Sequence, residues 1–164
     1  MAFTGKHRLA GEGGARVELE QCVLFRGLPE GILGEIHGLA TEREIAAETT
    51  IFCEGDPALE LHILAAGEVE LDYTLPNNPS IILPITRVTP GEVFAWSALA
   101  NNRTLTARAR TLSPCRVHVV PAAPLREILA AHPEAGYEVM SRLTELVASR
   151  LRDTRMQLRW LQTL

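Results

Sequence analysis

The sequence predicts an α+β fold in which an antiparallel β-roll is flanked by N-terminal helices and a long C-terminal helix. Apolar residues recur every three or four positions from Val17 to Leu39 and again after Pro121, which is the helical period. Between these regions lie short segments rich in Val, Ile, Thr and Leu, separated by turn-forming residues. Several short strands at this spacing are typical of a jelly-roll-like, double-stranded β-helix.

The elements follow in order along the chain. The sequence GLPEG divides the N-terminal pattern into two short helices. After the strands, APLREILAAH predicts a helix with proline near its first turn, and residues 133–162 predict a long second helix. We expect residues 1–16 to form a flexible tail and residues 17–164 to form one domain. The expected strands are Glu44–Ala47, Thr50–Cys53, Leu61–Ala65, Glu68–Tyr73, Ile81–Val88, Thr104–Thr111 and Arg116–Pro121.

The composition predicts a globular cytoplasmic protein. Hydrophobic residues make up 46% of the chain and charged residues 22%, and the net charge of −4 gives no overall basic field to attract nucleic acid. No apolar run reaches the roughly 20 residues that span a bilayer, and the N-terminus lacks the apolar centre of a signal peptide. Cys22, Cys53 and Cys115 form no CxxC pair, which favours buried cysteines over a disulfide framework.

A metal-dependent enzyme of the cupin type is one alternative, because cupins are also small β-rolls. Their metal site needs an H-x-H pair with a glutamate and a further histidine on neighbouring strands. The five histidines contain no H-x-H, and although His62 and His118 fall in expected strands, no third ligand is evident. No G-x-S-x-G, P-loop or Rossmann motif occurs either. We therefore expect no catalytic residues, no metal site and no required cofactor.

The stretch GEVFAWSALANNRTLTARA has the pattern of an anion-binding turn. AWSAL can form a short helical turn whose first amides lack intrahelical partners. Arg103 offers a planar, permanently charged fork for phosphate oxygens, and Ser97 and Thr104 offer hydroxyl groups. The alternative is that Arg103 closes a polar, solvated loop together with the two asparagines before it.

Five segments stand in a characteristic order: LFRGLPEGIL, IFCEGDPALELHILAAGEVEL, VTPGEVFAWSALANNRTLTARA, CRVHVV and RLRDTR. Together they cover roughly Leu24 to Leu158, and the chain resembles the cyclic-nucleotide-binding domain family, the sensor half of catabolite-activator-type transcription factors. The resemblance implies a small-molecule-sensing domain in which AWSAL is the phosphate-binding cassette. It implies these ligand-binding residues: Ala95, Trp96, Ser97, Ala98, Arg103, Thr104, Thr154 and Arg155.

The chain departs from the family at positions that matter for the ligand. Cyclic-AMP binders carry G-E-L/I-A-L, in which the glutamate accepts a hydrogen bond from the ribose 2′-hydroxyl. Ala95 replaces the glycine, so a methyl group restricts the approach of the backbone. Trp96 replaces the glutamate, and indole has no acceptor; it either packs as a lid on the core or walls a ligand.

Two further departures lie outside the cassette. In the last helix, RLRDTR keeps Thr154, but Arg155 replaces the serine of the family and favours an acidic group on the ligand. Glu48 stands at a glycine position, which predicts a reshaped turn. We therefore expect an anionic small molecule other than cyclic AMP. A ligand-free scaffold or dimerisation module is the main alternative.

The C-terminal helix predicts a protein partner. At 1.5 Å per residue it is about 45 Å long and outruns a domain of this size. We expect a two-fold dimer with a coiled-coil-like seam along its apolar stripe. A basic amphipathic helix on an anionic membrane is the alternative, which we do not favour because Trp160 would be its one strong aromatic. The stripe comprises Met140, Leu143, Val147, Leu151, Thr154, Leu158 and Leu161.

The resembling transcription factors continue into a winged helix-turn-helix after this helix. The sequence given ends at Leu164 and contains no such segment. We therefore expect no direct DNA binding, despite the four arginines within residues 150–159.

Overall fold

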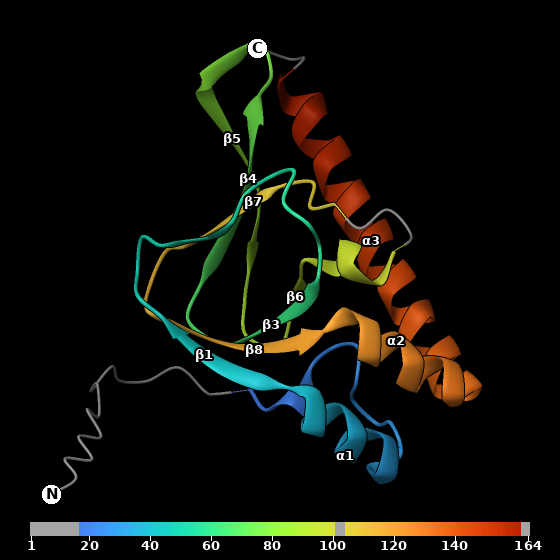
Figure 1. Cartoon of the computed structure of the whole chain (residues 1–164). Coiled ribbons are helices and arrows are strands. Elements are labelled where there is room, and N and C mark those ends of the chain that lie inside the picture. The colour runs from blue at the N-terminus through green and yellow to red at the C-terminus, as the bar shows by residue number, and fades with distance from the viewer. Residues whose placement is uncertain (1–16, 101–103, 162–164) are drawn as a thin grey trace, which may run out of the picture.

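A computed structural model gives the fold of residues 17–100 and 104–161, with side chains as far as Met156 (Figure 1). The expected tail at residues 1–16 lies outside the described residues. The helical elements are η1 (Leu19–Gln21), α1 (Glu30–Leu39), η2 (Trp96–Leu99), α2 (Ala122–Ala131) and α3 (Pro133–Leu161). The strands are β1 (Thr41–Ile45), β2 (Thr50–Phe52), β3 (Glu60–Ala66), β4 (Val69–Leu75), β5 (Asn78–Val88), β6 (Val93–Phe94), β7 (Arg108–Thr111) and β8 (Cys115–Pro121).

Two four-stranded antiparallel sheets form the roll, which confirms the predicted fold class. One sheet has the strand order β1-β8-β3-β6 and the other has the order β2-β7-β4-β5. Apolar side chains from both sheets meet between them and fill the roll. The buried residues of this cluster are Leu64, Val69, Leu71, Val88, Phe94, Ala109, Cys115, Val117 and Val119.

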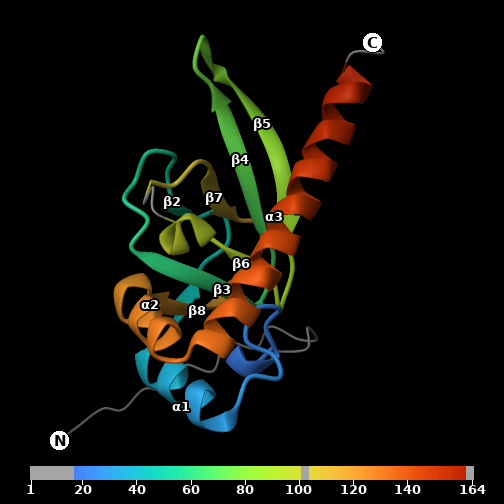
Figure 2. The same ribbon diagram turned by 90° about the vertical axis from the view of Figure 1, so that its right-hand side faces the viewer.

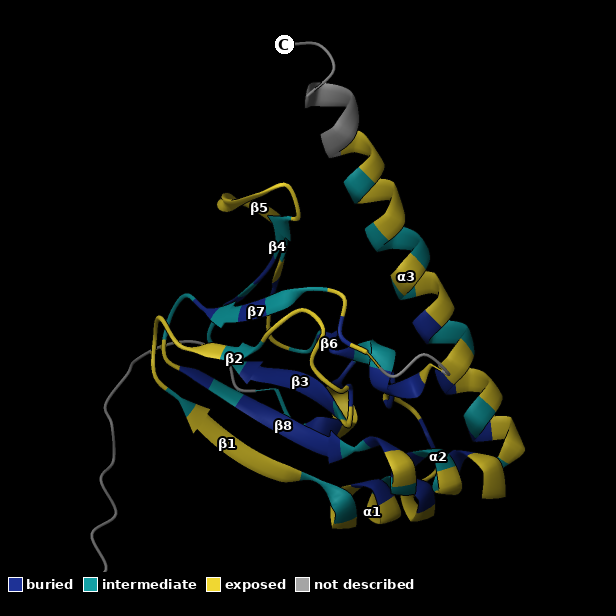
Figure 3. Cartoon of the chain, turned by 45° about the horizontal axis from the view of Figure 1, so that its top comes forward, coloured by how far each residue is buried: buried dark blue, intermediate teal, exposed yellow. Residues whose placement is uncertain are grey.

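The first sheet also carries the helices on its outer face. In β3, Leu61 and Ile63 join the helical core, whereas Leu64 faces the interior of the roll. A strand that is covered on both faces reads as a continuous apolar run, and β3 and β8 are buried over most of their length in Figure 3. The helical core includes Leu24, Phe25, Ile36, Leu125, Val139 and Leu143.

The sequence-based elements differ from the structure in four places, the first being β1, which was expected at Glu44–Ala47 and spans Thr41–Ile45. The strand expected at 104–111 begins only at Arg108, because the amide of Leu105 donates to the Asp56 carbonyl oxygen and its own carbonyl accepts from Gly55. Thr104 forms only an isolated bridge with Pro57. The first of the two N-terminal helices is a short 3₁₀ turn, η1, and the two-residue strand β6 was not predicted.

An ion pair holds β4 to β7. Asp72 and Arg108 are register partners, and Arg108 donates from Nε and Nη2 to the two carboxylate oxygens at 2.8 and 2.7 Å. Asp72 is fully buried, and its hydrogen bonds raise the pKa of Arg108. Next to this pair, Arg110 lies 2.7 Å from Glu48 and 3.6 Å from Glu70.

The turn between β1 and β2 keeps a conformation that favours glycine. Glu48 has a φ of +56°, in the left-handed region, and its amide donates to the Thr111 carbonyl oxygen at 3.0 Å. The glutamate is therefore accommodated with backbone strain that a glycine would not carry.

Replacing Glu48 with glycine is expected to raise the free energy of unfolding by about 0.5–1 kcal/mol, since relief of strain exceeds the entropic cost and the loss of a surface ion pair. Glu44 is the matched control because it is also exposed and pairs with an arginine, Arg116, at 2.7 Å, but lies in the strand β1. Glu44→Gly is expected to lower stability by about 1 kcal/mol. Urea denaturation measures both variants, and changes of the same sign would contradict the assignment of strain.

The apolar side chains of helix α3 are fully buried by the domain only near its start. Ala135, Val139 and Leu143 are buried, whereas Val147 and Leu151 are 41% and 51% exposed. In Figure 2 the helix runs past the β4–β5 hairpin with its C-terminal end projecting from the roll. Among the described residues, no helix has both the length and the apolar composition needed to cross a membrane.

Candidate functional site

The candidate site is built around η2, which follows β6 directly. Ala95 stands at the N-terminal cap of this turn, and its carbonyl accepts from the amide of Ala98 at 3.1 Å. The amides of Trp96 and Ser97 have no hydrogen-bond partner within the described residues. Two adjacent backbone donors at the start of a helical turn are suited to an anion.

Ala95 sets the shape of this turn. Its φ of +60° and ψ of 29° are left-handed, so the chain keeps at this position a backbone conformation that glycine adopts without strain. The methyl group is buried in a cluster with Ala58, Ala98, Ala122 and Leu105. Burial of this methyl group partly offsets the strain of the left-handed conformation.

The remaining cassette residues pack differently from one another. Trp96 is half-buried and packs against the helical core, the arrangement expected of a lid. Ser97 is half-buried, and its carbonyl accepts from Ala100 at 3.1 Å. Ala98 is fully buried, and its carbonyl oxygen accepts a hydrogen bond from Arg126 on α2. Thus η2 is attached to the helices at its C-terminal end while its N-terminal amides stay open.

The two cassette residues that follow are less well defined. Thr104 is exposed, and its backbone forms the isolated bridge with Pro57. Arg103, the expected phosphate fork, lies outside the described residues.

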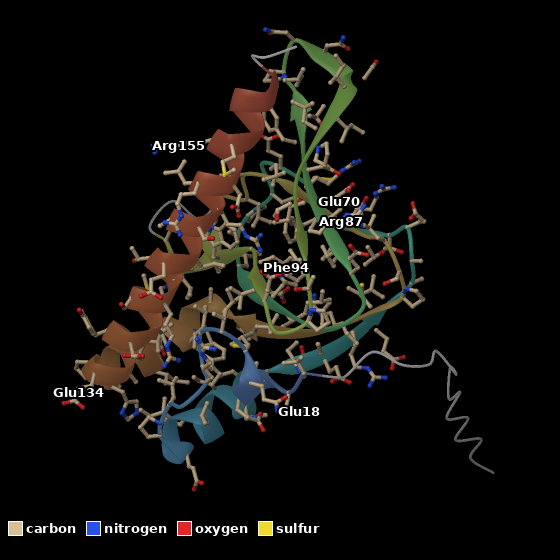
Figure 4. The ribbon with its side chains drawn as sticks, turned by 180° about the vertical axis from the view of Figure 1, so that it is seen from behind. Glu18, Glu70, Arg87, Phe94, Glu134 and Arg155 are labelled. Carbon is tan, nitrogen blue, oxygen red and sulfur yellow. The ribbon has the colours of Figure 1, made fainter. Side chains whose placement is uncertain are left out.

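Of the residues expected from α3, one approaches the roll and one does not. Thr154 is half-buried, and its Oγ1 donates to the Arg150 carbonyl oxygen at 2.9 Å. Arg155 is exposed, and in Figure 4 its side chain projects from α3 on the side away from the sheets.

Arg150 is the residue of this helix that sequence analysis missed. Its Nη1 donates to Thr86 Oγ1 at 2.6 Å and its Nη2 donates to Glu92 Oε1 at 2.9 Å. The other oxygen of Glu92 accepts from the amide and hydroxyl of Thr89 at 2.7 and 2.9 Å. Only 14% of the Arg150 side chain is exposed, and its Nε is buried with no partner in the described part of the chain. Its position at the start of RLRDTR was the one available signal.

The two strand histidines cannot share a metal ion. In the β3–β8 register, His62 faces Val119 and His118 faces Ile63. Because neighbouring residues of a strand point to opposite faces, His62 points into the roll and His118 points to the outer face. His118 instead lies 3.2 Å from the Val17 carbonyl oxygen through Nε2. The cupin-type site therefore has no geometric basis in this pair.

A family model described as "Cyclic nucleotide-binding domain" matches residues 42–132, which span the strands, η2 and α2. The chain belongs to the cyclic nucleotide-binding domain family. This confirms the resemblance carried by the five sequence segments, and the matched residues include η2, the turn expected to be the phosphate-binding cassette.

Relatives of this domain occur in regulatory proteins. The CRP-like cAMP-activated global transcriptional regulator of Mycobacterium tuberculosis is 24% identical over 136 residues, which cover 83% of this chain and 58% of that protein. The chain thus spans a little over half the length of this relative. A candidate cyclic nucleotide-binding protein from Geobacter metallireducens GS-15 is 30% identical, with a TM-score of 0.67 over 78% of this chain and 91% of that one. The c-di-GMP responsive global regulator CLP of Xanthomonas campestris has a similar fold, with a TM-score of 0.70, 19% identity and coverage of 83% and 66%.

Proposed function

We propose that this cyclic nucleotide-binding domain is a sensor for an anionic small molecule other than cyclic AMP or cyclic GMP. One observation carries the proposal. The cassette turn keeps a shape that presents the open amides of Trp96 and Ser97, while an indole stands where cyclic-AMP binders have a carboxylate. The anion-binding half of the cassette is therefore retained, and the ribose-binding half is lost.

The missing carboxylate sets the expected selectivity. A ribose hydroxyl that is buried without an acceptor forfeits about 1–3 kcal/mol, which corresponds to a loss of affinity of roughly tenfold to a hundredfold. In this proposal the anion is held by the two amides and by Arg103, with Thr104 beside it. On α3, Thr154 matches the threonine with which the resembling family contacts the base, whereas Arg155 projects away from the sheets, and Arg150 has a buried Nε on the same helix.

The exchange Ala95→Gly with Trp96→Glu tests this selectivity. The wild-type domain is expected to bind cyclic AMP and cyclic GMP more weakly than low micromolar, and the double variant is expected to bind at least about tenfold more tightly, because it regains the acceptor. Calorimetry measures both. Ala95→Gly alone is the matched control and is expected to show little of this increase in affinity, because it does not restore the acceptor. A dissociation constant in the low-micromolar range or tighter for cyclic AMP or cyclic GMP with the wild type would contradict the proposal.

Anion binding itself is tested with inorganic phosphate and sulfate. Both ions are expected to raise the melting temperature of the wild type and not that of Arg103→Ala. Arg87→Ala is the control, since Arg87 is an exposed arginine paired with Glu68 at 3.0 Å on the second sheet. If neither ion stabilises the wild type, the domain is better described as a ligand-free scaffold.

We also propose that the regulatory output passes through α3 to a second copy of the chain. The exposed apolar residues Val147 and Leu151 lie one helical turn apart on this helix, beyond the part that its own domain covers. Arg150, between them in sequence, ties the same segment to β5 and to the β5–β6 turn. A movement of β5 or of the β5–β6 turn is therefore transmitted to the segment of α3 on which the second copy would pack.

A further inference from the structure

A second cavity lies between β1 at the edge of one sheet and β2 at the edge of the other, and its lining residues Phe52 and Leu105 pack in the same cluster as Ala95 and Ala98. Its volume is 410 Å³, within the range of small-molecule sites. No residue of the cassette turn lines it. The lining residues used below are Arg43, Phe52, Asp56, Glu60, His62 and Leu105.

His62 provides an acceptor that nothing in the described chain satisfies. Its side chain is 8% exposed, and its ring lies 5.6 Å from the ring of Phe52 and 5.2 Å from that of Phe94. Burial lowers the pKa of His62 to about 4, so the imidazole is neutral near pH 7. Nε2 lies 3.8 Å from Glu60 Oε2, which favours the proton on Nε2, and the buried Nδ1 then carries an unpaired lone pair.

The charged groups of the cavity also favour a donor. Arg43 already donates from Nη1 and Nη2 to the two oxygens of Glu60, at 3.1 and 2.7 Å. Asp56 accepts one hydrogen bond, from the amide of Cys53 at 2.8 Å, and retains further lone pairs. One guanidinium therefore faces two carboxylates, and the lining has a net negative charge at neutral pH. The cavity therefore favours a cation, whereas the cassette favours an anion.

We propose that this cavity binds a small aromatic amine that carries a second hydrogen-bond donor on its ring. The apolar wall of Phe52 and Leu105 accepts the ring, and the ammonium group lies between Asp56 and Glu60, within reach of the face of Phe52. The ring donor pairs with His62, whose imidazole rotates about its Cβ–Cγ bond to present Nδ1. The site shares no lining residue with the cassette turn, although Phe52 and Leu105 pack in one cluster with Ala95 and Ala98.

Tyramine is the probe, and 3-(4-hydroxyphenyl)propionate is its matched control, because it has a similar size with a carboxylate in place of the ammonium. In calorimetry with the full chain, tyramine is expected to bind saturably, and the propionate at least about tenfold more weakly. Amide NMR is expected to place the shifts in residues 51–62. Failure of tyramine to saturate at millimolar concentration, or equal binding of the propionate, would overturn the proposal.

Variants locate the binding. Glu60→Gln is expected to weaken tyramine about tenfold, whereas Glu44→Gln, on the same sheet but paired with Arg116, leaves it unchanged. His62→Phe keeps the aromatic stack and is also expected to weaken binding. Arg87→Ala, on the second sheet, is expected to have no effect on tyramine. Wild-type affinity in Glu60→Gln, or equal losses in Glu60→Gln and Glu44→Gln, would show that the amine does not bind in this cavity.

Discussion

Replacing Arg108 with methionine is expected to lower the free energy of unfolding by about 3–5 kcal/mol. Asp72 is fully buried, and Arg108 makes both of the side-chain hydrogen bonds described for its carboxylate. Methionine keeps the apolar cover over the carboxylate while removing the charge that balances it. Urea denaturation followed by circular dichroism measures the loss.

Two controls separate this effect from a general loss of charge on the sheet. Arg110→Met is expected to cost at most about 1 kcal/mol, because Glu48, its near partner, is 65% exposed. The double variant Arg108→Met with Asp72→Leu is expected to recover most of the lost stability, since no buried charge is left unpaired. Equal losses in the Arg108 and Arg110 variants would contradict the account of Asp72.

Replacing both Val147 and Leu151 with glutamate is expected to convert a dimer to a monomer at micromolar concentration, with self-association weakened more than about a hundredfold. Two glutamates on neighbouring turns of α3 would place charges in an apolar seam where they lack partners. The fold is expected to survive, because both side chains are largely outside the core. Sedimentation velocity measures the oligomeric state.

The matched control changes the same positions without adding charge. Val147→Leu with Leu151→Met keeps the stripe apolar and is expected to stay dimeric. A wild-type chain that sediments as a monomer would refute the seam. Co-sedimentation with anionic liposomes would then test the membrane alternative.

Local patterns predicted the helices better than the loops that close the roll. The helical period placed α3 at residues 133–162, and the structure has Pro133–Leu161. The strand expected at 104–111 failed in its first half, because Leu105 bonds to Gly55 and Asp56, some 50 residues away. Alternation along a strand carries no information on such a distant partner.

The same limit applies to the candidate site, where local sequence patterns predicted less than the contacts between distant residues decide. Sequence analysis identified Ala95 and Trp96 as departures from the family. It did not predict that Ala95 would keep a left-handed backbone, since this depends on the side chains that pack around it from distant parts of the chain. Arg150 was one of four clustered arginines in the sequence. Only the approach of α3 to Thr86 and Glu92 distinguishes it from the others.

Because only part of α3 is covered, a small tilt of this helix is amplified along its exposed length. Leu143 is its last buried residue among those whose side chains are described. Trp96 and Leu99 of η2 pack in the same cluster as Leu143, so η2 contacts the helix where its buried part ends. From Leu143 to Leu161 the helix extends about 27 Å at 1.5 Å per residue. A tilt of about 10° about Leu143 moves the far end of the helix sideways by roughly 5 Å. In the proposed dimer, a small displacement at η2 is therefore expected to move the far end of α3 sideways relative to the partner helix, and the contacts of Arg150 with Thr86 and Glu92 must move with it.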